Sequence, residues 1–81
     1  MAEKQITVDL DVDVASREEI IFEDGQSSNE WLAPYDLRLT VQDVVGPQGM
    51  PTVIIIGHED DLLRFLAEQL PDVERNLEEV N

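Results

Sequence analysis

The sequence predicts an α+β fold: one acidic domain over residues 1–81, with an antiparallel sheet of about four strands covered on one face by a C-terminal helix, and a short terminal helix. Apolar and polar residues alternate over 6–14 and 35–42, as they do in half-buried strands. A β-branched run at 52–56 is typical of a strand buried on both faces, and apolar residues recur at helical spacing over 59–70. A chain of 81 residues is expected to build a single core.

The first strand is predicted from an uninterrupted alternation. Its inward face consists of Ile6, Val8, Leu10, Val12 and Val14. Its outward face carries Thr7, Asp9, Asp11 and Asp13. Because no helical period fits this pattern, we expect one half-buried strand with an acidic outer face.

Residues 19–23 are predicted to form a second strand that pairs back on the first as a hairpin. They contain three adjacent apolar side chains and end at the turn-forming pair Asp24-Gly25. Ser16 and Glu19 also have the spacing of a capping box, so a short helix from residue 17 is the alternative.

Turn signals and a second alternation define the middle of the chain. Ser27 can cap one helical turn through Leu32, and Pro34 would end that turn. The strand that follows directs inward Tyr35, Leu37, Leu39 and Val41. Glycines and prolines make 46–51 a loop, and 52–56 is the expected central strand.

The C-terminal part is predicted to be helical. The carboxylates of Glu59, Asp60 and Asp61 favour the positive end of a helix. The apolar stripe that would lie on the sheet is Leu62, Phe65, Leu66 and Leu70. Pro71 interrupts this helix, and Asp72 can cap a second short one. The apolar stripe of the second helix would be Val73, Leu77 and Val80.

Charge and composition restrict the function. Nineteen acidic residues against five basic ones give a net charge of −14, which repels phosphate backbones and anionic lipid, so direct binding to nucleic acid or to such a membrane is not expected. The absence of cysteine excludes disulfides and thiolate metal sites. No apolar run has the length of a signal peptide or a membrane span, so we expect a soluble, cytoplasmic protein.

No catalytic motif is present, and neither an enzyme nor a bound cofactor or metal is expected. Asp9, Asp11 and Asp13 have the spacing of the start of a calcium loop. The glycine and glutamate that such a loop needs at its sixth and twelfth positions are replaced by Val14 and Ile20. The sole histidine, His58, is expected to face solvent at a helix start.

The three aspartates have a second interpretation. Alternate residues on one strand face stand roughly 6.5–7 Å apart, a spacing comparable to that of neighbouring phosphates on a nucleic-acid strand. Such a row can occupy a cationic groove built for nucleic acid. The acidic residues expected beside the row or at its ends are Glu18, Glu19, Glu23 and Asp24. Alternatively, a charged outer strand only prevents association between sheet edges.

The expected function is therefore that of a small binding protein. It would mimic nucleic-acid charge and inhibit a basic nucleic-acid-handling protein, as DNA-mimic inhibitors of restriction or CRISPR systems do. Trp31 is a second candidate contact residue, although a lone Trp commonly plugs one end of a small core. The alternative function is a house-keeping subunit or adaptor from a halophilic organism, since Lys4 is the only lysine. The oligomeric state is left open.

Overall fold

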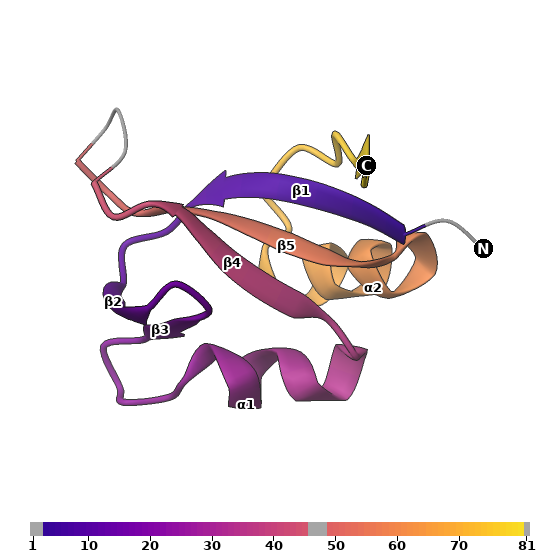
Figure 1. Ribbon diagram of the computed structural model, residues 1–81. Helices are drawn as coiled ribbons and strands as arrows, with labels where there is room; N and C mark the ends of the chain where they lie inside the picture. The colour runs from indigo at the N-terminus through magenta and orange to yellow at the C-terminus, as the bar shows by residue number, and fades with distance from the viewer. Residues whose placement is uncertain (1–2, 46–48, 81) are drawn as a thin grey trace.

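The structure is a computed structural model, which describes residues 3–45 and 49–80. Its strands are β1 (Glu3–Asp9), β2 (Asp13–Ser16), β3 (Glu19–Ile21), β4 (Arg38–Asp43), β5 (Thr52–His58) and β6 (Glu78–Glu79). Its helices are α1 (Ser28–Leu32), which continues as a 3₁₀ turn (Ala33–Tyr35), and α2 (Glu59–Gln69). Part of the predicted 46–51 loop, residues 46–48, lies outside the described residues. Figure 1 shows the sheet in front of α2, with the β2–β3 hairpin at one end.

The main sheet has the strand order β4-β5-β1-β6, and every neighbouring pair is antiparallel. Ile55 on the central strand lies opposite Ile6 on one side and Leu39 on the other. Because paired residues point to the same face, these three side chains build one buried layer. The predicted α+β class, with a four-stranded antiparallel sheet, is confirmed.

Helix α2 covers this layer, as the sequence predicts. It packs on β5 and β1, and Leu62, Phe65 and Leu66 are completely buried. The acidic residues of its first turn face the positive end of the helix dipole. The predicted one-turn helix also forms: Ser27 caps α1 by accepting a hydrogen bond from the Glu30 amide at 3.4 Å.

The predicted strand over 6–14 is wrong as a single element, because the chain turns at 10–12. β1 ends at Asp9, which lies opposite Thr52, the first residue of β5. One more hydrogen bond follows, from the Leu10 amide to the Pro51 carbonyl at 3.0 Å. Because Pro51 has no N–H to donate in return, the pairing ends there and the chain leaves the sheet. β2 then belongs to a separate two-stranded sheet.

A hairpin does form, although not with β1. β2 pairs with β3, and the pairs include Val14 with Ile20 and Ser16 with Glu19. The alternative of a helix from residue 17 is wrong: residues 17 and 18 form the hairpin turn, in which Ser16 Oγ accepts from the Glu18 amide at 3.3 Å.

Two details of the later strands also differ from expectation. Tyr35 is buried as predicted, but it lies in the 3₁₀ turn, and β4 begins only at Arg38. The central strand is buried on one face only. Ile54 and Ile56 point to the other face of the sheet and are half-buried, because the helices cover only the first face.

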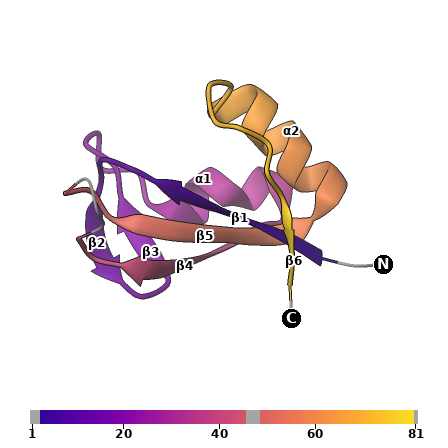
Figure 2. The same cartoon turned by 90° about the horizontal axis from the view of Figure 1, so that it is seen from above.

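The predicted terminal helix is wrong. Within the described residues the chain after Gln69 contains no further helix, and β6 pairs with the free edge of β1, where Lys4 lies opposite Glu79. Val73 and Leu77 still pack against the core, but from an irregular segment. An edge strand has unpaired amides and carbonyls, and pairing with β6 satisfies part of that edge. Figure 2 shows β6 alongside β1, at the opposite end of the molecule from the hairpin.

Candidate acidic and apolar contact sites

The three aspartates of the predicted row do not form one row. Asp9 stays on β1, where its Oδ1 accepts a hydrogen bond of 2.6 Å from Thr52 Oγ1 on the neighbouring strand. Asp11 lies in the turn after β1, and Asp13 begins β2. The structure therefore separates the first aspartate from the other two.

Asp11 and Asp13 meet Glu23 around an acidic hollow, which is a surface depression of about 230 Å³ lined by these three residues and Val12. All three acidic residues are exposed. Among the described residues the ion pairs involve other carboxylates, so none of these three charges is neutralised by a lysine or arginine. The hollow therefore concentrates negative charge at the hairpin.

The other predicted acidic residues lie at different places on the hairpin. Glu18 is exposed in the hairpin turn, and Glu19 is half-buried opposite Ser16. Asp24 accepts a hydrogen bond from the Gln26 amide at 3.0 Å and so shapes the loop that leads to α1. These residues surround the hairpin with carboxylates, but they do not line the acidic hollow.

Trp31 lies in an aromatic cluster. Its ring makes edge contacts with Phe22 and Phe65, each at a centroid distance of 4.7 Å, and it is half-buried. Its indole nitrogen donates to Gln69 Oε1 at 3.0 Å, and Gln69 in turn donates to the Tyr35 hydroxyl at 3.1 Å. These contacts connect the hairpin loop, α1 and α2, so Trp31 holds the core together where they meet.

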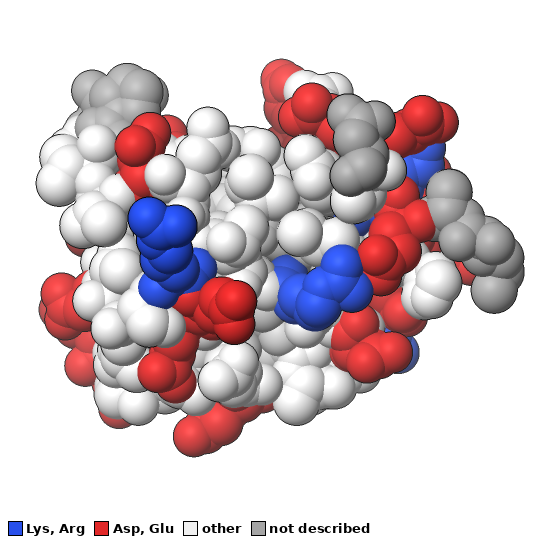
Figure 3. All heavy atoms as spheres, viewed as in Figure 1, with Lys and Arg blue, Asp and Glu red and all other residues white. Residues whose placement is uncertain are grey.

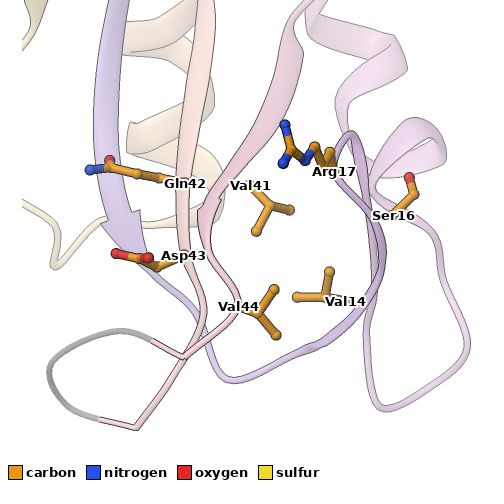
Figure 4. A pocket seen from close by; sticks show the side chains of 7 residues that line it. All are labelled: Val14, Ser16, Arg17, Val41, Gln42, Asp43 and Val44. Carbon is orange, nitrogen blue, oxygen red and sulfur yellow. The ribbon is translucent and has the colours of Figure 1, made fainter.

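A second concave surface, the valine groove, was not predicted from the sequence. Its volume is about 500 Å³, and it is lined by Val14, Ser16 and Arg17 of the hairpin region and by 41–44 of the β4 end. In Figure 4 the side chains of Val14, Val41 and Val44 point toward one another, whereas those of Gln42 and Asp43 point away. The exposed pair Val44-Val45 was the available signal, because two adjacent apolar residues before a loop commonly mark a contact surface.

The open face of the main sheet is a third surface. Figure 3 shows acidic side chains around its margins and basic side chains at only a few places. Arg38 donates to both carboxylate oxygens of Glu3, at 2.9 and 3.0 Å. These hydrogen bonds lower the pKa of Glu3 and raise the pKa of Arg38. The face is therefore occupied by its own ion pair.

Residues 3–45 and 49–80 contain no group of three or more His, Asp or Glu side chains arranged to hold a metal ion. Within these ranges no helix is both long and apolar enough to cross a bilayer.

No protein-family model matches the chain, and neither curated proteins nor solved structures show a significant match.

Proposed function

We propose that this protein is a non-enzymatic binding protein that presents its hairpin carboxylates to a basic site on a nucleic-acid-handling protein and so competes with nucleic acid there. The observation that carries the proposal is the acidic hollow: three exposed carboxylates gather in one depression, and none of them takes part in an ion pair among the residues that the structure describes. Such an arrangement raises the local negative potential, which attracts and orients a basic partner.

The distribution of charge adds support. Asp11 and Asp13 lie on a short turn and strand held by a hairpin, so the two carboxylates are presented by ordered backbone. A preordered charge array loses less conformational entropy on binding than a flexible acidic tail does. The partner would release counterions from its basic site, as it does when it binds nucleic acid.

A second candidate function is an acidic subunit adapted to high salt. Carboxylates also occupy regions far from the hairpin, such as the first turn of α2 and the C-terminal segment with Asp72 and Glu74. A surface selected only for hydration in salt would show this spread. Such a protein should unfold when salt is removed, whereas an acidic mimic should stay folded at about 20 mM salt.

The test uses two variants with the same net charge. One carries Asp11→Asn, Asp13→Asn and Glu23→Gln at the acidic hollow. The control carries Asp72→Asn, Glu74→Gln and Glu78→Gln, whose side chains are exposed in the C-terminal segment away from the hairpin. Each variant, together with the parent, is used to capture proteins from a host lysate, and the captured protein is then purified and titrated directly.

The expected result is a captured nucleic-acid-binding protein that nucleic acid displaces from the parent. Its affinity should fall about a hundredfold or more for the hollow variant, because each charge pair in an interface is worth on the order of 1–3 kcal/mol. The control variant should lose much less. Equal losses in both variants would show that only net charge matters, and failure of nucleic acid to compete would overturn the proposal.

A further inference from the structure

The valine groove is held open by hydrogen bonds between its two walls. The Val41 amide of β4 donates to the Arg17 carbonyl in the hairpin turn at 2.6 Å, and Thr40 Oγ1 donates to the same carbonyl at 3.4 Å. These contacts fix the distance between hairpin and β4 at one end of the groove. The depression is therefore part of the folded structure, and its volume of about 500 Å³ is within the range of ~300–1,000 Å³ typical of binding pockets.

The groove exposes apolar surface. Val14 and Val41 pack partly against the core, and Val44 on the rim is 63% exposed. Burying such a side chain in an interface is favourable in proportion to the apolar surface that is removed from water. An aliphatic side chain of a partner would enter the groove and cover Val44.

The acidic hollow and the groove lie on the two sides of the same short strand, β2. Asp13 lines the hollow and Val14, the next residue of β2, lines the groove. Successive residues of a strand point to opposite faces, so the two concave surfaces flank the same short strand. The groove lining combines three valines with polar and charged residues, among them Arg17. Apolar side chains bordered by charge are the usual arrangement of an interface centre with its rim.

We infer that the valine groove is the apolar anchor point of the same interface and takes an aliphatic side chain from a basic segment of the partner. This inference rests on the proposed function, which it extends by naming the chemistry of the contact. The charge selects the occupant: at −14, a second copy of this chain is repelled, whereas a segment rich in lysine and arginine is attracted.

Three synthetic peptides test the inference without knowledge of the natural partner. The first has the sequence Lys-Arg-Lys-Leu-Lys-Arg-Lys, the second has Ser in place of Leu, and the third, Ser-Gln-Ser-Leu-Ser-Gln-Ser, has the leucine without the charge. Each is titrated into ¹⁵N-labelled protein at low salt. The leucine-containing basic peptide should shift the amides of Val14, Val41 and Val44 in addition to those of Asp11 and Asp13.

A matched pair of variants locates the anchor. Val44→Asn replaces a groove residue, and Val45→Asn replaces the next residue, which is 72% exposed and does not line the groove. Val44→Asn should weaken the leucine-containing basic peptide about tenfold and leave the serine peptide unchanged. Val45→Asn should change neither by more than about twofold. A melting curve verifies folding, and Val44→Thr, which keeps the branched shape, serves as a second variant.

The outcomes separate this inference from the proposed function. If both basic peptides bind equally and Val44→Asn changes neither, the groove assignment is wrong while the acidic contact stands. If neither basic peptide binds, both proposals fail. Equal binding of the uncharged leucine peptide, or a dimer in sedimentation that Val44→Asn abolishes, would overturn the choice of a basic occupant.

Discussion

Arg38 and Glu3 are joined by a two-pronged ion pair that spans the central strand. Arg38 lies on β4 and Glu3 on β1, and β5 runs between them, so the side chains meet over the open face of the sheet. Both hydrogen bonds are 3.0 Å or shorter. A bidentate geometry makes this pair more specific than an ordinary surface ion pair, although the solvent around it screens the attraction.

The pair should give stability that depends on pH. Arg38 lowers the pKa of Glu3 in the folded state, so the contribution is present above the ordinary pKa of a glutamate and is lost as pH falls through the lowered value. We expect a double-mutant cycle with Glu3→Gln and Arg38→Gln to show favourable coupling at pH 7 that disappears in acid. The measurement is urea unfolding at several pH values. Coupling that grows on acidification would contradict the assignment.

Truncating Leu66, one of the α2 side chains that cover the sheet, should be strongly destabilising. Leu66 is completely buried, and Leu66→Ala is expected to cost about 2–5 kcal/mol through lost contact and a cavity. Leu63→Ala on the same helix is the control, because Leu63 is 36% exposed and should lose far less. Thermal melting compares the two. Equal melting temperatures for both variants would mean that α2 faces the sheet differently.

Removing the buried hydroxyl of Ser28 should lower the free energy of unfolding by more than the small size of the group suggests. Ser28 Oγ accepts the amide of Ile20 at 3.1 Å and so links α1 to β3. Ser28→Ala leaves that buried amide without its partner, which costs about 1–3 kcal/mol. Ser16→Ala, whose hydroxyl accepts an exposed amide, should stay within about 0.5 kcal/mol of the parent. Chemical unfolding measures both, and a neutral Ser28→Ala would mean that water replaces the hydroxyl.

Truncation of Trp31 should destabilise the fold, and this effect has to be separated from any effect on binding. Its edge contacts with Phe22 and Phe65 predict that Trp31→Ala costs about 3 kcal/mol or more, a large share of the stability of a small domain. Trp31→Phe keeps an aromatic ring and loses the indole donor to Gln69, so it should cost clearly less. Circular dichroism during heating distinguishes them. Only Trp31→Phe is then suitable for a binding experiment.

The parts predicted correctly from the sequence are those whose pattern is complete within one segment. The run from Thr52 to Ile56 favours a strand whatever surrounds it, and the spacing of Leu62, Phe65 and Leu66 favours a helix. The cap at Ser27 is also a local signal, since the Ser27 hydroxyl and the amide that donates to it are three positions apart.

The break after Asp9 has no counterpart in the pattern of side chains. Leu10 and Val12 in the turn and Val14 on β2 all pack partly against the core, so the alternation continues although the chain has changed sheets. The end of β1 is determined by where β5 begins, which lies more than forty residues away in the sequence. Periodicity reports which side chains are buried, whereas strand partners depend on distant backbone.

The C-terminal segment and the valine groove were missed for the same reason. Val73 and Leu77 have helical spacing, but they reach the core from an irregular segment, and the β6 pairing uses the edge of the N-terminal strand. The groove joins 14–17 to 41–44, two segments that only the tertiary fold brings together. Of the candidate acidic site, the hairpin location was accessible to sequence reasoning, whereas the separation of Asp9 was not.

Mutation of Asp9 should lower the stability of the fold more than mutation of its hydrogen-bond partner Thr52. This result would identify Asp9 as a residue that supports the fold more than the contact surface. Thr52 is 7% exposed, and its hydroxyl donates to the exposed carboxylate of Asp9 at 2.6 Å. Asp9→Ala leaves a nearly buried hydroxyl unpaired and should cost about 1–3 kcal/mol, whereas Thr52→Val leaves only an exposed carboxylate in water and should cost less. Asp11→Ala, whose carboxylate lines the hollow, is the control and should be neutral or slightly stabilising, since it removes one of many like charges. Urea unfolding measures all three free energies. If Asp11→Ala were the most destabilising of the three, the hollow would be a structural element, and its carboxylates would not be free to bind a partner.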